Sequence, residues 1–217
     1  MSKKRRQDPE IWTDFNNFIR RNRKRFLIRQ NSIVIWMTGL SGAGKTTLAN
    51  ALNNELLNKG YFTKTFDGDI VRMGLNKDLG FSIEDRQENV RRIAEVSKLF
   101  IDSGLIVICS FISPTIEARE IAKNIIGSDR FIEIYVNSSL EVCEQRDPKG
   151  LYRLARQGVL KNFTGIDSIY EPPVKTDIEV RSDFWNIKTC SKVILKEVLP
   201  RIRFKSLFRE RILKNIK

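Results

Sequence analysis

The sequence contains no histidine, and this absence limits the chemistry that the protein can perform. Without an imidazole, a general base has to be a carboxylate, a lysine or a tyrosine. Catalytic triads that use histidine and most zinc sites are excluded for the same reason. The three cysteines, Cys109, Cys143 and Cys190, lack the spacing of a metal or redox site. They predict buried thiols in a reducing compartment.

Long apolar runs are also missing, and stretches such as residues 105–109 are far too short to cross a bilayer. The chain starts with a basic stretch, Lys3–Arg6, and no apolar core follows it. We therefore expect no secretory signal and a cytoplasmic location. With 217 residues, 41% of them apolar, the chain is long enough for one globular domain with appendages.

The net charge of +13 is concentrated at the two ends of the chain. Residues 1–30 carry ten Lys or Arg against three acidic residues, residues 201–217 carry seven against one, and residues 31–200 are balanced. We expect a basic leader (1–30), a central globular domain (31–200) and a basic tail (201–217). The tail alternates basic and apolar residues, which suits contact with nucleic acid, an anionic membrane or a partner enzyme, or weak packing on its own domain.

Short apolar segments alternate with amphipathic ones along residues 31–200. The predicted strands are 32–37, 61–66, 105–111, 131–136 and an edge strand at 177–180, and the predicted helices are 45–59, 82–102, 113–126, 139–146 and 189–199. This alternation predicts an α/β fold with a mostly parallel sheet flanked by helices on both faces. Residues 149–163, rich in Gly, Lys and Arg, predict a mobile lid.

A complete phosphate-binding motif follows the first predicted strand, because residues 39–46 match G-x-x-x-x-G-K-[ST]. In such P-loops, backbone amides surround the β-phosphate and the next helix points its positive end at it. Lys45 is expected to bridge the β- and γ-phosphates, and the Thr46 hydroxyl to reach Mg²⁺. The predicted nucleotide-binding residues are Gly39, Ser41, Gly42, Ala43, Gly44, Lys45, Thr46 and Thr47.

Three classes of P-loop protein compete for this motif: a GTPase switch, a motor or ATPase module, and a small-molecule kinase. Residues 76–78 read Asn-Lys-Asp, but Leu79 stands where a GTPase motif needs aspartate. The chain is also short for a motor. Asp67 and Asp69 follow the second strand, where a carboxylate can orient an acceptor hydroxyl, take its proton or hold water on magnesium. They favour the kinase over a solvated turn.

Basic side chains in the next helix suggest where an anionic acceptor binds. Arg86 and Asn89 are three residues apart and share a helix face. Together with Arg72 they could form a basic pocket. The alternative is a solvated, charged helix face that also includes Arg91 and Arg92.

Longer motifs recur in one order along the chain. They are Trp36–Thr47, Gly74–Ser82, Glu84–Arg86 with Glu88 and Asn89, Ser110–Pro114, Asp147–Tyr152, and Phe163–Asp167 with Tyr170 and Glu171. On these motifs the chain resembles the adenylylsulfate kinase (APS kinase) family from about Trp36 to Leu199. The resemblance implies transfer of the γ-phosphoryl group of ATP to the 3′-hydroxyl of adenylyl sulfate, with Mg²⁺, in sulfate assimilation. It also implies a homodimer.

The resemblance assigns roles to individual residues. By analogy, Arg72, Arg86 and Asn89 hold the phosphosulfate group, and Phe81 and Phe163 stack on the acceptor's adenine. The implied catalytic residues are Lys45, Asp69 and Ser113, and the implied acceptor residues are Asp67, Asp69, Arg72, Phe81, Arg86, Asn89, Ile112, Lys149 and Phe163. Ser113 matches a serine described in some relatives as phosphorylated, although in-line transfer needs no covalent intermediate.

Two positions depart from the family pattern. Ile70 stands where the family has asparagine, and Met73 where it has histidine. If the missing asparagine side chain contacted substrate, its loss would weaken the binding free energy by about 0.5–1.5 kcal/mol. A related P-loop kinase with another nucleotide-linked acceptor is therefore the alternative function, and the basic ends could add binding to a polyanion or a membrane.

Overall fold

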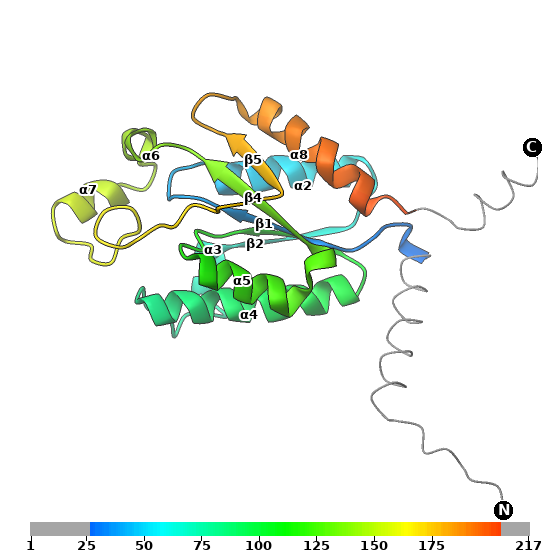
Figure 1. Ribbon diagram of the computed structural model, residues 1–217, viewed down its shortest axis with the longest axis horizontal. Coiled ribbons are helices and arrows are strands. Elements are labelled where there is room, and N and C mark those ends of the chain that lie inside the picture. The colour runs from blue at the N-terminus through cyan, green and yellow to red at the C-terminus, as the bar shows by residue number, and fades with distance from the viewer. Residues whose placement is uncertain (1–26, 205–217) are drawn as a thin grey trace, which may run out of the picture.

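A five-stranded parallel sheet forms the centre of the computed structural model, which describes residues 27–204. The strands are β1 (Val34–Thr38), β2 (Thr63–Asp67), β3 (Ile106–Ser110), β4 (Phe131–Asn137) and β5 (Ile178–Arg181). Their order is β2-β3-β1-β4-β5, and every neighbouring pair is parallel (Figure 1). β1 is central, and β5 is the predicted edge strand. All five predicted strands are therefore confirmed.

Helices cover both faces of the sheet. They are α2 (Lys45–Asn58), α3 (Gly68–Arg72), α4 (Ile83–Asp102), α5 (Ile116–Ile126), α6 (Leu140–Arg146), α7 (Leu151–Arg156) and α8 (Ile187–Ile202), with a 3₁₀ turn at Ser128–Arg130. α2 and α8 lie on one face, and α4 and α5 lie on the other (Figure 1). This arrangement confirms the predicted α/β fold with helices on both faces of a parallel sheet.

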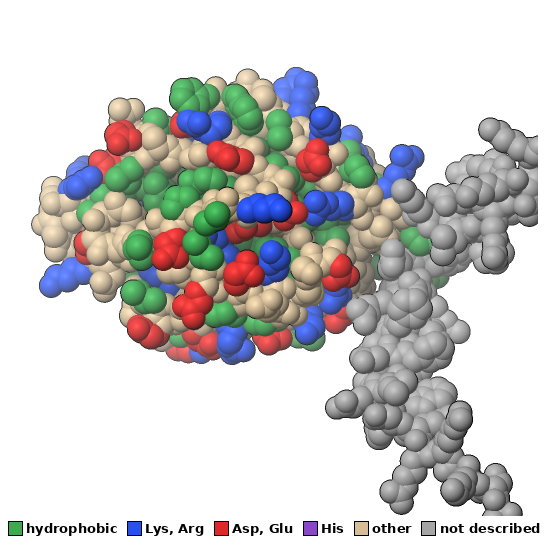
Figure 2. Space-filling model, in the orientation of Figure 1, with side chains coloured by type: hydrophobic (Ala, Val, Ile, Leu, Met, Phe, Trp, Pro, Cys, Tyr) green, Lys and Arg blue, Asp and Glu red, His purple; other side chains and the backbone are tan. Residues whose placement is uncertain are grey.

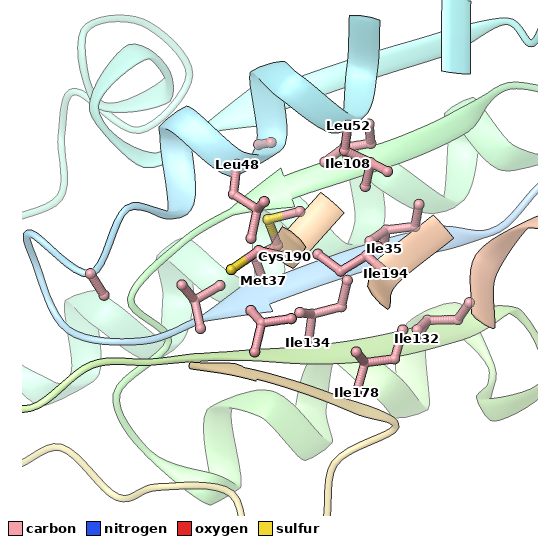
Figure 3. Packing of buried hydrophobic residues seen from close by; sticks show 14 of the residues in the cluster. Ile35, Met37, Leu48, Leu52, Ile108, Ile132, Ile134, Ile178, Cys190 and Ile194 are labelled. Carbon is pink, nitrogen blue, oxygen red and sulfur yellow. The ribbon is translucent and has the colours of Figure 1, made fainter. Parts of the chain in front are cut away.

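The core is divided in two by the side-chain alternation of β1. Ile35 and Met37 pack with α2 and α8, whereas Val34 and Trp36 pack with α4 and α5. In the first cluster, side chains of β1, β3, β4 and β5 pack against side chains of α2 and α8, as Figure 3 shows. Fully burying such a side chain is worth about 1.5–3 kcal/mol. The central strands are therefore the firmest support for the loops that follow them.

Side-chain caps set the starts of several helices, α4 and α5 among them. The Ser82 hydroxyl accepts from the Asp85 amide at 3.1 Å, which caps the first turn of α4. The Asp85 carboxylate, however, accepts from the Gly80 amide at 3.0 Å instead of turning back to Ser82. Thr115 caps α5, so that helix begins at Ile116 and not at residue 113 as predicted.

Three further helices differ from the sequence prediction. α3 and α7 were not predicted, because helices of five and six residues are too short to show a helical period. α8 continues three residues past the predicted end at Leu199, with Pro200 inside its last turn. Both unpredicted helices lie beside the cleft described below, where they shape its walls.

Both ends of the described chain meet beside the amino-terminal ends of the central strands. The Asn31 amide donates to the Ile202 carbonyl at 2.7 Å. The Gln30 side chain donates to the carbonyls of Phe62 and Gly104, just before β2 and β3. The predicted leader and tail lie outside the described residues apart from 27–30 and 201–204.

Positive and negative side chains are interspersed over the described surface that Figure 2 shows, in keeping with the charge balance of residues 31–200. In the described part of the chain, no helix is both long and apolar enough to span a bilayer.

Candidate active site

The loop between β1 and α2 depends on glycine at two tight points. At Gly39 an added Cβ would lie 2.5 Å from the Val136 carbonyl oxygen, and at Gly42 it would lie 2.9 Å from that of Cys143. Gly44 has a φ of 92° and offers no side chain to cap α2. The amides of the first turn of α2 thus remain available to an anion, as phosphate binding requires.

Lys45 stands at the floor of this loop and is 8% exposed. Its ammonium group donates to the carbonyls of Gly39 at 2.9 Å and Leu40 at 2.8 Å. Burial lowers the pKa of the Lys45 amine to about 8, while the carboxylates of Asp67 and Asp69 oppose that shift. A triphosphate would give this buried ammonium a far better partner than two carbonyls.

A hydroxyl and a carboxylate meet where β1, β2 and β3 end. The Thr46 hydroxyl donates to Asp67 at 2.7 Å and lies 3.4 Å from the Ser110 hydroxyl. The other oxygen of Asp67 accepts from the Asp69 amide and caps α3. These oxygens suit Mg²⁺, which takes few protein ligands and keeps water and phosphate oxygens. Within residues 27–204, no cluster of three or more acidic or cysteine side chains could hold a metal ion by itself.

Asp69 points from α3 towards the start of the predicted lid. Its carboxylate forms an ion pair with Lys149, and both side chains are more than half exposed. An exposed pair of this kind contributes little to stability because water screens it. The two groups can therefore separate at little cost when a ligand enters between them.

Two guanidinium groups flank one aromatic ring across the cleft. Arg72 lies 4.6 Å and Arg86 5.4 Å from the centre of the Phe81 ring. Arg72 also donates to the carbonyls of Leu79 and Gly80, and Arg86 to that of Phe81. The backbone thereby holds two positive charges beside an exposed ring. The structure brings these residues together as the basic-pocket interpretation predicts.

Neighbouring arginines on α4 behave differently. Arg86 and Asn89 are buried and line the cleft, whereas Arg91 and Arg92 form ion pairs with Glu88 on the surface. The predicted alternative, a solvated charged face, is therefore correct for Arg91 and Arg92 alone.

The predicted lid contains α7 and contacts both halves of the site. The Tyr152 hydroxyl of α7 donates to the Ser41 carbonyl at 2.9 Å. Phe163, at the end of the lid, is 7% exposed and lies edge-on to Tyr152, with ring centres 4.9 Å apart. Arg86 donates to the Asn162 carbonyl at 2.7 Å. Phe163 thus packs inward, whereas Phe81, its predicted stacking partner, is half exposed.

Ser113 is held by two residues that sequence reasoning missed. Its hydroxyl accepts from the indole nitrogen of Trp36 at 2.9 Å, and its carbonyl accepts from the buried Arg119 at 2.8 Å. Its backbone φ is 44°, in the left-handed region. The neighbouring Ile112 carbonyl accepts from Thr38 at 2.7 Å. These contacts fix Ser113 in the wall of the cleft.

The phosphate-binding loop, the carboxylates of Asp67 and Asp69, and the guanidinium groups of Arg72 and Arg86 border one cleft of about 890 Å³. Every predicted site residue lines it except Gly39, which lies buried beneath the loop. The departures from the family pattern, Ile70 and Met73, do not line the cleft and are 65% and 76% exposed. The lining residues that sequence reasoning missed include Arg146, Asp147, Leu151, Ser182, Trp185, Ile187 and Cys190.

Comparison with known proteins gives consistent matches. The family model described as adenylylsulphate kinase matches residues 31–181. The adenylyl-sulfate kinase of Clostridium acetobutylicum is 53% identical over 79% of this chain and 84% of its own length. That of Bacteroides thetaiotaomicron is 48% identical over 90% of this chain and 97% of its own.

Solved structures agree with these relatives. The Mycobacterium tuberculosis APS kinase in complex with AMPPNP and APS superposes with a TM-score of 0.75 at 40% identity. That match covers 78% of this chain and 98% of the other. A hexameric APS kinase from Thiobacillus denitrificans gives a TM-score of 0.61 at 27% identity, over 89% of this chain and 33% of that one.

Proposed function

The chain belongs to the adenylylsulfate kinase family, and we infer that it transfers the γ-phosphoryl group of ATP to the 3′-hydroxyl of adenylyl sulfate. The products are ADP and 3′-phosphoadenylyl sulfate. One observation carries this function: a single cleft joins a complete phosphate-binding loop to a cradle of guanidinium groups beside an exposed ring. A nucleoside triphosphate and a second anionic nucleotide need these two halves.

On the donor side, the chain offers a preorganised site for a triphosphate. We propose that the amides of the loop and of the first turn of α2 bind the β-phosphate, and that Lys45 turns from its two carbonyl partners to bridge the β- and γ-phosphates. This assignment is supported by the burial of Lys45, since a charge in a poorly hydrated site interacts strongly with an opposite charge.

We propose that a divalent cation binds beside the phosphate-binding loop. Thr46 and Asp67 would hold Mg²⁺, which would neutralise charge on the β- and γ-phosphates. The test is a titration of activity with MgCl₂: Thr46→Val should raise the concentration that gives half-maximal rate. An unchanged midpoint would contradict this assignment.

On the acceptor side, we propose that Arg72, Arg86 and Asn89 bind the phosphosulfate group and that Phe81 stacks on the adenine. Phe163 would complete that contact from the lid, and Ile112 would line the same half. The short distances from both guanidinium groups to the Phe81 ring support a site that combines charge with stacking.

For the transfer itself, we propose that Asp69 orients the 3′-hydroxyl and accepts its proton as the oxygen attacks the γ-phosphorus in line. In the free protein this carboxylate is paired with Lys149. The acceptor would enter between the two groups, leaving Lys149 to face its negative charge. The lid, 149–163, would then exclude water from the transferring group.

The direct test measures ADP release from Mg-ATP with adenylyl sulfate and with a panel of other nucleotide-linked hydroxyl acceptors. We expect clear preference for adenylyl sulfate and a product phosphorylated at the 3′-position. Equal or faster turnover of another acceptor would overturn the assignment. The alternative acceptor was suggested by Ile70 and Met73, and their exposure outside the cleft removes that motive.

The oligomeric state and the domain boundaries are also proposals. We propose that the chain works as a homodimer, which light scattering of the purified protein would test by its molar mass. We propose the division into a leader (1–30), a kinase domain (31–200) and a tail (201–217), supported by the family match at 31–181. Removing 1–25 and 205–217 should leave turnover intact.

A further inference from the structure

The loop between α3 and α4 forms the base of the acceptor cradle. The Asn76 amide donates to the Val71 carbonyl at 2.9 Å, which closes the loop on α3. Asp78 receives both terminal nitrogens of Arg92 at 2.8 Å each, which ties the loop to α4. The Asn-Lys-Asp stretch that partly matches a guanine-binding motif therefore has a different role here. It fixes the loop between the two elements that carry Arg72 and Arg86.

Asn76 makes one further contact, with a residue of the cleft. Its side chain is 0% exposed, and its Nδ2 donates to the Oδ1 of Asn89 at 2.8 Å. Asn89 is nearly buried on α4 and lines the cleft. Since Asn76 occupies the oxygen of the Asn89 amide, the amino group of Asn89 is the end left for a ligand.

The direction of this amide decides what Asn89 can bind. An amino group donates hydrogen bonds to the oxygens of a phosphate or sulfate, which only accept. A reversed amide would present its own oxygen to the same anion and repel it. The arrangement also leaves Oδ1 of Asn76 buried without a hydrogen-bond partner among residues 27–204. Such an oxygen is costly, and orienting Asn89 supplies a reason for its retention.

We propose that Asn76 is a positioning residue: it fixes the amide of Asn89 so that the acceptor's anionic group meets an N–H donor. This inference rests on the proposed function, because it assumes that Asn89 contacts the phosphosulfate group. It adds a determinant of acceptor specificity that itself touches no substrate.

A loop anchor without this positioning role would respond differently to substitution. Asn76→Asp preserves size but removes the donor, so its carboxylate would accept from Asn89 and turn that amide round. Asn76→Ala removes the contact and leaves the Asn89 amide without a fixed direction. Positioning predicts that the isosteric Asp is the more harmful change for acceptor binding. A purely structural anchor predicts that Ala is the more harmful.

The experiment is a double-mutant cycle on the full chain with Asn76→Asp, Asn76→Ala, Asn89→Ala and the two double variants. KM for adenylyl sulfate, KM for ATP and kcat are measured for each, and melting temperatures verify folding. Asn124→Asp, on the exposed side of α5, controls for the added charge.

We expect Asn89→Ala and Asn76→Asp each to raise KM for adenylyl sulfate about tenfold, the value of one hydrogen bond to a charged group. Asn76→Ala should raise it less, and KM for ATP should change less than about twofold in every variant. In the Asn89→Ala background, neither Asn76 substitution should add to KM, since no amide remains to be oriented.

Full additivity in the Asn89→Ala background, or an equal rise in KM for ATP, would overturn the positioning role. It would show that Asn76 supports the loop alone. An unchanged acceptor KM in Asn89→Ala would instead contradict the proposed contact between Asn89 and the acceptor, and the inference would fail with that premise. If Asn76→Asp does not fold, the Asn76→Ala cycle gives the same decision.

Discussion

The hydroxyl of Tyr152, on the lid helix α7, donates a 2.9 Å hydrogen bond to the backbone carbonyl of Ser41 in the phosphate-binding loop. The ring of the same tyrosine lies edge-on to Phe163 at the other end of the lid. This hydrogen bond thus attaches the lid to the donor half of the cleft, and the ring contact packs the two ends of the lid together. Its position depends on the loop that would hold the triphosphate.

Removing this bond should loosen the link between lid and loop. Tyr152→Phe keeps the ring packing on Phe163 and removes about 0.5–1.5 kcal/mol of hydrogen bonding. We expect kcat/KM for ATP to fall about two- to tenfold. Steady-state kinetics measures it, and Tyr61→Phe is the matched control because no hydrogen bond from its hydroxyl is found among residues 27–204. Equal losses in both variants would contradict a specific role for Tyr152.

Nucleotide affinity should fall as pH rises through about 8. Burial lowers the pKa of Lys45 to about 8 in the free protein, and bound phosphates would raise it again by stabilising the ammonium form. Below pH 8 the amine is already charged and binds directly. Above pH 8 binding must take up a proton, so affinity drops by up to about tenfold per pH unit.

Calorimetric titration with a non-hydrolysable ATP analogue between pH 6.5 and 9.5 would measure this slope. Repeating it at pH 9 in buffers of different ionisation enthalpy would reveal the proton uptake. Lys45→Met should bind weakly at every pH, without the slope. A wild-type affinity that stays constant across this range would contradict a titrating Lys45.

Neutralising Asp69 should slow the chemical step more than binding. If the carboxylate takes the proton of the 3′-hydroxyl, Asp69→Asn should lower kcat about 10²–10⁴-fold, while KM for ATP stays close to that of the wild type. Asp129→Asn, at an exposed position far along the chain, is the matched control. A kcat reduced by less than about tenfold would exclude Asp69 as the base.

Replacing Ser113 should affect stability more than turnover. Ser113→Ala leaves the indole nitrogen of Trp36 without its acceptor, an unsatisfied buried donor that costs about 1–3 kcal/mol. We expect a lower melting temperature and a kcat within about threefold of the wild type, since direct in-line transfer needs no serine intermediate. Loss of all activity in a folded Ser113→Ala protein would support a covalent route.

Restoring the family residues on α3 and directly after it should change little. Ile70→Asn and Met73→His alter side chains that are mostly exposed and outside the cleft lining. Exposed substitutions of this kind are usually worth less than about 0.5 kcal/mol, or roughly twofold in an equilibrium constant. KM for adenylyl sulfate, measured for the single and double variants, tests this. A several-fold improvement would show that these positions reach the acceptor.

The sequence predicted the strands well because they are short apolar runs, and the long helices because their amphipathic period extends over many residues. It also predicted the donor loop, since the glycines and Lys45 act through local backbone geometry. The short helices α3 and α7 were not predicted, because they have too few residues to show a helical period. The contact of Trp36 with Ser113 spans 77 residues. Such a pairing exists only once the sheet has brought β1 beside the segment after β3, so no local pattern could reveal it.

The acceptor half of the cleft could also be predicted only in part from the sequence. Spacing alone placed Arg86 and Asn89 on one face of α4, but it could not separate them from Arg91 and Arg92, whose partners are on the surface. Which amide atom of Asn89 faces a ligand depends on Asn76, thirteen residues earlier in the chain. That decision belongs to packing and not to periodicity.

The hydrogen bonds of Gln30 with Phe62 and Gly104, and of Asn31 with the end of α8, hold both ends of the described chain on one side of the molecule. This side is suited to surface attachment. It lies at the amino-terminal ends of the strands, whereas the cleft opens at their carboxyl-terminal ends. An enzyme attached to a bead or electrode at residue 27 or residue 204, the ends of the described chain, would keep the cleft towards the bulk solution. Orientation on such a support would then be set by the architecture of the sheet, without any engineered linkage near the reacting groups.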